Sequence, residues 1–309
     1  MVTASPALVA SRAVRTPQIS PATYQRVTLV ALVLLAIIIV TGGAVRLTGS
    51  GLGCPTWPKC ETSSLVPRGE TGGHGVIEFV NRVFTGFVSL AVIVAVLGSL
   101  WRTPRRRDLT VLSLGLVAGV IGQIVLGGIT VVFDLWPPLV MAHLILSLVL
   151  VADAVVLHHR AGQPDGPRVP IVAPEVRAMG RWLIVATSVV VVTGTVVTGA
   201  GPHAGDDQVK RLDIAVTDVA RIHGIAENLF LVAVLVTLWL LHRTAAPQRT
   251  RRDAQVLLGV LVAQAAVGYA QYFSGVPAFL VGIHLLGATL VWIAVLRFSL
   301  RLQTVVATP

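Results

Sequence analysis

Long apolar stretches recur along the chain, separated by short polar segments. Each stretch runs for about 19 to 25 residues, which is long enough to cross a hydrocarbon core of roughly 30 Å as an α-helix. We place eight such spans near residues 27–45, 77–100, 109–133, 139–158, 181–201, 223–241, 255–273 and 278–299. The pattern predicts an all-α integral membrane protein with eight transmembrane helices.

The third and fourth spans share a spacing with the seventh and eighth. Gln123 precedes His143 by the same distance as Gln264 precedes His284, and glycines stand in the same register between each pair. Similarity at this separation indicates repeated structural units. We therefore expect two duplicated four-helix bundles.

The duplication predicts how the chain is divided. We expect a cytoplasmic tail over 1–26, an N-terminal half over 27–160 and a C-terminal half over 179–300. A polar linker rich in Gly and Pro, 161–178, would join the halves, and 301–309 would form a second cytoplasmic tail.

Basic residues gather on one side of these spans. The chain has 24 Lys and Arg against 14 Asp and Glu. Of these 24, 17 precede the first span or follow an even-numbered span: Arg12, Arg15, Arg26, Arg102, Arg105, Arg106, Arg107, Arg160, Arg168, Arg177, Arg181, Arg243, Arg249, Arg251, Arg252, Arg297 and Arg301. The positive-inside rule then predicts a multi-pass protein of the plasma membrane with both termini cytoplasmic. Because topology accounts for the charge, we do not expect nucleic-acid binding.

Cys54 and Cys60 are the only cysteines, and they lie in the Pro-containing loop after the first span. The predicted orientation places this loop on the outer, oxidising side, which favours a disulfide. The alternative is a metal pair, but no neighbouring ligands complete a tetrahedral shell. The spacing leaves open whether a disulfide here is redox-active.

Four polar side chains share one helical face where the second span begins: His74, Glu78, Asn81 and Arg82. Charged groups at this depth are costly unless they have partners or a function. We interpret the face as the lining of a pocket. The alternative is an interfacial cap stabilised by an ion pair between Glu78 and Arg82.

The C-terminal half offers two histidines from its second and fourth helices. Aligning the halves places His223 on Asn81 and His284 on His143. Two imidazoles from facing helices of a bundle are a common way to bind haem iron from both sides. Arg221 could then meet the haem propionates. The alternative is that each histidine only caps a helix end.

Taken together, these features resemble the haem A synthase family over about residues 25–300. They are the eight spans, the duplicated halves, the Cys54–Cys60 loop, the Glu78-x-x-Asn81-Arg82 motif and the single histidines 143, 223 and 284. The resemblance implies an oxidoreductase that converts the C8 methyl group of haem O to a formyl group by successive hydroxylations. The product, haem A, serves terminal cytochrome oxidases. The resemblance also implies a b-type haem cofactor in the C-terminal half.

The resemblance also implies roles for particular residues. His223 and His284 would bind the iron of haem b, His143 would bind the iron of the substrate haem, and Glu78 would be the catalytic carboxylate. Cys54 and Cys60 would form an outer-loop disulfide.

One position departs from the family pattern. Many members have histidine where this chain has Asn81, and an amide is a poor iron ligand. Either His143 holds the substrate haem alone, or His74 on the same helical face supplies the second ligand. Asn81 and Arg82 would border the substrate haem in both cases.

Two further classes of protein compete with this interpretation. A dihaem b-type quinol cytochrome would need four histidines in two pairs, which Asn81 and Glu78 disfavour. A repeat-built transporter would need polar residues near the bilayer centre.

The implied partners are haem O, the lipid bilayer, haem O synthase (protohaem farnesyltransferase) and oxidase assembly factors. The sequence leaves open the electron acceptor and whether the chain forms a homo-oligomer.

Overall fold

The computed structural model describes residues 18–69 and 72–306, and over these residues the chain consists of long helices and one small sheet. The helices are α1 (Pro21–Leu47), α2 (Gly72–Trp101), α3 (Arg107–Val132), α4 (Pro137–Ala161), α5 (Pro174–Ala200), α6 (Val216–Arg243), α7 (Gln248–Phe273) and α8 (Ala278–Leu300). All 8 are long and apolar enough to cross a membrane. The prediction of an all-α, multi-pass membrane protein is therefore confirmed.

Most of the helices begin earlier than the apolar stretches that predicted them. α1 begins at Pro21, where the Ser20 side chain accepts a hydrogen bond from the Thr23 backbone N–H. α7 begins at Gln248, within a run of arginines. Hydropathy detects only the part of a helix that suits hydrocarbon, whereas backbone hydrogen bonding continues through the polar turns.

The predicted division of the chain stays a prediction, although some of its boundaries fall inside helices. Residues 21–26 of the expected tail belong to α1, and residues 174–178 of the expected linker belong to α5. The outer parts of both expected tails, with Arg12 and Arg15, lie outside the described residues.

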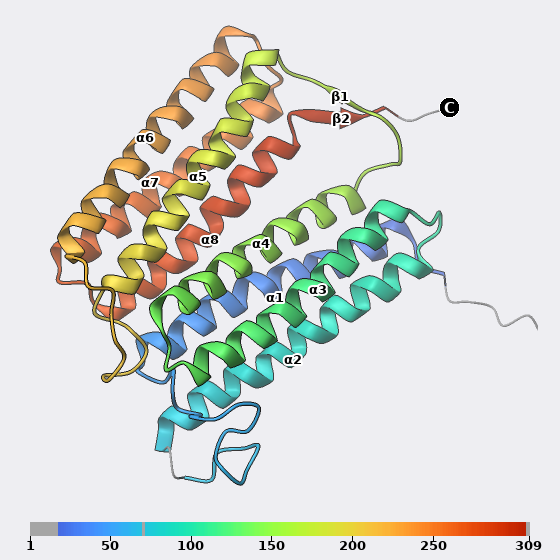
Figure 1. The fold of residues 1–309 in the computed structure, drawn as a ribbon. Helices are drawn as coiled ribbons and strands as arrows, with labels where there is room; N and C mark the ends of the chain where they lie inside the picture. The colour runs from blue at the N-terminus through green and yellow to red at the C-terminus, as the bar shows by residue number, and fades with distance from the viewer. Residues whose placement is uncertain (1–17, 70–71, 307–309) are drawn as a thin grey trace, which may run out of the picture.

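The helices pack in two groups, α1–α4 and α5–α8 (Figure 1). In each group the first helix contacts the second and fourth, and the third helix contacts the same two. Each group has its own apolar core. One contains Tyr24, Leu109 and Leu157, and the other contains Leu183, Phe230 and Phe298.

The groups meet where α1 and α4 pack against α8, and α4 packs against α5. The buried indole N–H of Trp292 donates to the Leu148 carbonyl oxygen at 2.9 Å. Arg46 of α1 donates to the Thr198 carbonyl oxygen at 2.8 Å. Lipid offers no hydrogen-bond partners, so these two bonds satisfy polar atoms that would otherwise be unpaired. They also join the two groups of helices.

The two ends of the molecule differ. One end, here called the loop end, carries the connections 48–71 and 201–215. The opposite end, here called the terminal end, carries the connections 102–106 and 162–173, and the described chain begins and ends there (Figure 1). At the terminal end, β1 (Arg168–Pro170) pairs antiparallel with β2 (Gln303–Val305).

Candidate functional site

Four positions near the loop end share one local construction. In each, a side chain of an even-numbered helix faces a glycine of the preceding odd-numbered helix. The pairs are Asn81 with Gly42, His143 with Gly127, His223 with Gly194, and His284 with Gly268. A Cβ on the glycine facing each histidine would lie 3.0 to 3.2 Å from the ring Cε1 atom. Glycine therefore lets each imidazole lie directly against the neighbouring helix.

Polar side chains hold both histidines of the C-terminal group by the same ring atom. The Thr193 hydroxyl lies 3.0 Å from Nδ1 of His223. The Gln264 amide nitrogen lies 3.0 Å from Nδ1 of His284 and donates to the His284 carbonyl oxygen at 2.9 Å. A hydrogen bond at one ring nitrogen fixes the orientation in which the other binds a metal.

Within the described residues, neither the His223 ring nor the His284 ring forms a hydrogen bond through Nε2. The Thr193 hydroxyl can accept from Nδ1–H of His223, which leaves Nε2 of that ring unprotonated for a metal. The Gln264 amide nitrogen can only donate, so Nδ1 of His284 accepts and the neutral ring carries its proton on Nε2. Metal binding there would require the amide to turn its unpartnered Oε1 atom toward Nδ1–H.

The two rings are also separated by a distance that suits a shared metal ion. Their centroids lie 6.4 Å apart, and their planes are inclined at 74°. With metal–nitrogen bonds of ~2 Å and each centroid ~1 Å behind its nitrogen, two imidazoles on opposite sides of one ion have centroids ~6 Å apart. Within the described residues, no cluster of three or more His, Cys, Asp or Glu side chains could hold a metal. The pair therefore suits an ion that brings its other ligands with it.

The corresponding histidine of the N-terminal group is held differently. The Gln123 amide nitrogen donates to the His143 carbonyl oxygen at 3.1 Å and to the Ser147 hydroxyl at 2.6 Å, and not to the ring. Nδ1 of His143 is buried without a hydrogen-bond partner among the described residues. On the facing helix, the Asn81 amide oxygen accepts a hydrogen bond from Thr41 at 2.9 Å. This half thus offers one unanchored imidazole and an amide whose oxygen is already occupied.

Glu78 and Arg82 form an ion pair that holds the loop after α1. Glu78 is only 6% exposed, and its Oε1 atom accepts from the Arg82 guanidinium at 2.5 Å. Its Oε2 atom accepts from the Cys54 backbone N–H at 2.7 Å. Arg82 also donates to the carbonyl oxygens of Cys54, Thr56 and Lys59. The ion pair that the cap interpretation required is therefore present, and it fastens the loop to α2.

The loop itself is closed by a disulfide between Cys54 and Cys60, which confirms the disulfide and not the metal pair. Between the two cysteines, the Trp57 ring packs against Gly128 of α3, where a Cβ would lie 2.7 Å from the ring. Gly128 follows the glycine that faces His143. The loop therefore links the Glu78–Arg82 pair on α2 to the part of α3 beside His143.

His74 lies apart from these contacts. Its side chain is exposed, and Nδ1 lies 2.9 Å from the Ser50 hydroxyl. It lines a cavity of about 500 Å³ at the loop end together with Arg46 and His203. His74 makes no hydrogen bond to Asn81 or His143 among the described residues. Its role as an iron ligand stays a prediction.

Comparison with known proteins adds a decisive observation. A model of the family described as "Cytochrome oxidase assembly protein" matches residues 25–296. The chain belongs to this family. A protein named "Heme A synthase" from Listeria monocytogenes serovar 1/2a is 26% identical over 275 residues, which cover 84% of this chain and 89% of that protein. A protein of the same name from Shouchella clausii is 32% identical over 171 residues, covering 52% of this chain and 54% of its own length.

The family match confirms the resemblance drawn from the residues. In this member of the cytochrome oxidase assembly protein family, however, sequence reasoning missed several contributors to the site. Glu227, one turn beyond His223, is half-buried and lies about 4.0 Å from where a Cβ on Gly268 would stand, beside His284. A carboxylate at i+4 from a histidine in an apolar helix could have revealed it. Thr193 precedes Gly194 as Thr41 precedes Gly42, and this repeat could have revealed it, whereas Trp57 gave no comparable signal.

Proposed function

We propose that the chain is a haem A synthase, an oxidoreductase that converts the C8 methyl group of haem O to a formyl group. In each of two hydroxylations the methyl carbon would lose a C–H bond and two electrons and gain a hydroxyl group from water, giving an alcohol and then an aldehyde hydrate, which loses water. The four electrons would pass through the resident haem to an external electron acceptor. Family membership and the names of the relatives support this function. The structural observation that carries it is the inequality of the two halves, since one presents an anchored pair of imidazoles and the other a single unanchored imidazole.

In the C-terminal half, His223 and His284 would hold haem b, which supplies one-electron transfer when bound. Their 6.4 Å centroid separation suits two imidazole ligands of one iron. Thr193 and Gln264 hold the rings through Nδ1. Iron binding at Nε2 of His284 would be accompanied by rotation of the Gln264 amide, whose unpartnered Oε1 atom would then accept from Nδ1–H. Anchoring of this kind suits a cofactor that stays bound.

In the N-terminal half, His143 would bind the iron of the substrate. Its ring is unanchored because the Gln123 amide is taken by the Ser147 hydroxyl. The position after His284 that corresponds to Ser147 is Ala288, which cannot compete for Gln264. An imidazole free to reorient suits a haem that enters as substrate and leaves as product. The exposed, Ser50-bound position of His74 supports binding by His143 alone, with Asn81 opposite.

Glu78 would act on the substrate as a fixed carboxylate. Its two oxygens already accept hydrogen bonds from Arg82 and the Cys54 N–H. A carboxylate held in this way is suited to stabilise positive charge that develops at the methyl carbon. The disulfide loop, fastened by Arg82 and seated through Trp57, would exclude water from this half.

The distribution of arginines supports an orientation in the plasma membrane. Segments 102–107, 160–181, 243–252 and 297–301 lie at the terminal end and carry 14 of the 20 arginines of the described residues. The positive-inside rule then places the terminal end in the cytoplasm and the disulfide loop outside. Haem O synthase would be the partner that supplies the substrate.

The proposed function predicts a product in cell membranes. We expect a bacterium that makes haem O but lacks its own haem A synthase to accumulate haem A when it expresses this chain. Extracted membrane haems separated by chromatography provide the measurement, with an empty vector as the control. Membranes that contain the full-length chain but only haem O would contradict the proposal.

A further inference from the structure

A polar cavity of about 580 Å³ lies at the terminal end, at the opposite end of the molecule from His143, His223 and His284. Its walls come from the start of α3, the end of α4, the connection to β1 and the strand β2. The charged residues that line it are Arg106, Arg107, Asp108, Arg160, Asp165 and Arg168. Four of these six side chains are guanidinium groups, so the cavity carries excess positive charge.

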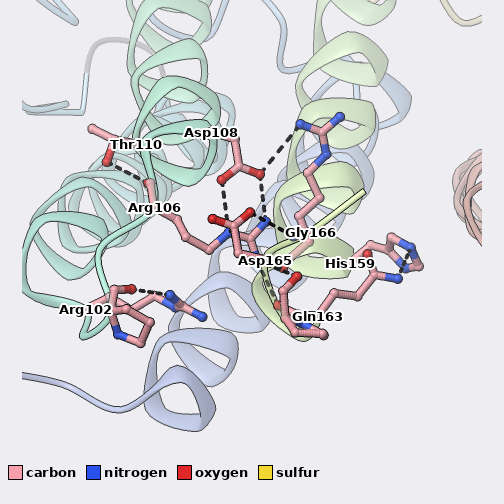
Figure 2. Close-up of polar contacts among 11 residues, drawn as sticks. Arg102, Arg106, Asp108, Thr110, His159, Gln163, Asp165 and Gly166 are labelled. Carbon is pink, nitrogen blue, oxygen red and sulfur yellow. Dashed lines mark hydrogen bonds and ion pairs between the residues drawn. The ribbon is translucent and has the colours of Figure 1, made fainter. Parts of the chain in front are cut away.

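One arginine and one aspartate build the wall of this cavity. Arg106 is only 4% exposed, and it donates to both carboxylate oxygens of Asp108 at 2.8 and 3.1 Å. It also donates to the carbonyl oxygens of Arg160, Gln163 and Pro164, where α4 ends. Figure 2 shows Arg106 and Asp108 gathered with Gln163 and Asp165. These contacts satisfy Arg106 and remove it from the charge open to a ligand.

The other arginines remain open to a ligand. Arg107 and Arg168 are exposed, and neither side chain has an ion pair or hydrogen bond among the described residues. Nε of Arg160 is buried without a partner there, and its Nη1 atom lies 3.8 Å from Asp108. Arg107 of α3 and Arg168 of β1 therefore line the cavity without an acidic partner among the described residues, and Arg160 of α4 shares Asp108 with Arg106.

The chemistry of these groups favours a phosphate. Guanidinium groups bind phosphate oxygens through paired, charge-assisted hydrogen bonds. α3 begins at the cavity, and the Asp108 carboxylate lies in its first turn, so the donors for a phosphate come from the arginine side chains. A basic pocket between transmembrane helix ends is a typical site for an acidic lipid headgroup.

The surface beside the cavity matches a lipid. Val111 and Leu114 follow Arg107 along the same face of α3, and they are 58% and 51% exposed. Acyl chains could lie along this apolar face while their headgroup enters the cavity. We propose that the cavity binds the phosphate group of an anionic phospholipid, which would bridge α3 and α4 to the C-terminal strand β2. The proposal does not depend on the haem chemistry.

Binding of defined lipids to the purified full-length chain tests this proposal. The probes are short-chain phosphatidylglycerol, short-chain phosphatidylcholine and inorganic phosphate, and native mass spectrometry in detergent reports occupancy. The variant R107Q/R168Q removes two arginines that make no structural contact. The variant R249Q/R252Q removes the same charge from the start of α7 at the same end. We expect phosphatidylglycerol to bind the pocket variant roughly 30-fold more weakly and the control variant as tightly as the unaltered chain.

A change of opposite sign completes the test. Asp165 has an exposed side chain 3.9 Å from Arg106, so D165N should tighten phosphatidylglycerol binding by removing a repulsive charge. Inorganic phosphate that binds as tightly as the lipid and is lost with R107Q/R168Q would assign the cavity to a free anion and overturn the lipid assignment. Equal weakening in both arginine variants, or no weakening in either, would overturn the site.

Discussion

Replacing His223 or His284 with alanine is expected to leave the purified protein without its resident haem. Each imidazole would supply one of two iron ligands, and Thr193 and Gln264 orient the rings for that purpose. Mutation of a residue that only hydrogen-bonds a metal ligand typically lowers metal affinity 10- to 100-fold. Removal of the ligand itself should therefore lower haem affinity by more than about tenfold. The haem-to-protein ratio, measured from the Soret absorbance and protein mass, checks this expectation.

His242 provides a matched control for this experiment. It lies on α6, as His223 does, but in the last turn at the opposite end and on an exposed surface. H242A should retain the full haem content. If H223A and H284A bound as much haem as H242A, the two rings would be helix-capping residues and the proposed cofactor site would be wrong.

Replacing Glu78 with glutamine is expected to abolish formation of haem A while haem O still binds. Positioned acid–base and electrostatic groups typically contribute 10²- to 10⁴-fold to a rate, so we expect a loss within about that range. Glutamine keeps the size of the side chain and can still accept from the Cys54 N–H. The measurement compares haem O retained by the purified variant with haem A formed in membranes.

A variant of a second buried carboxylate near the disulfide distinguishes a catalytic effect of E78Q from an effect on loop folding. Glu61 is 2% exposed and accepts a hydrogen bond from the Arg68 backbone N–H at 2.7 Å, much as Glu78 accepts from Cys54. E61Q should form haem A at nearly the normal rate. An E78Q variant that still accumulates haem A would remove the catalytic role, and an E61Q variant as inactive as E78Q would assign both residues to the loop.

Much of this architecture could be predicted from the sequence because lipid imposes simple rules on a chain. A span must be long and apolar, which located all eight helices. The matched spacing from Gln123 to His143 and from Gln264 to His284 identified paired positions, and both amides do contact those histidines. The compartment predicted for Cys54 and Cys60 correctly favoured a disulfide.

What the sequence could not predict depends on packing between helices. The spacing alone made the two glutamines equivalent, yet a serine at position 147 diverts the Gln123 amide from the ring of His143. The contact of Trp57 with Gly128 depends on the path of an irregular loop. The pairing of β1 with β2 joins two three-residue segments far apart in the chain, and strands so short leave almost no periodic signal.

The haem content of the purified protein tests the central claim most directly. Haems would be extracted from protein expressed with and without a source of haem O, identified by mass and counted per chain. A haem A synthase with the proposed cofactor site should carry one protohaem per chain in both preparations. Haem O, its hydroxylated form or haem A should appear only with the source. Two protohaems per chain in both preparations would instead indicate an electron-transfer cytochrome, and absence of any haem would contradict both proposed haem sites.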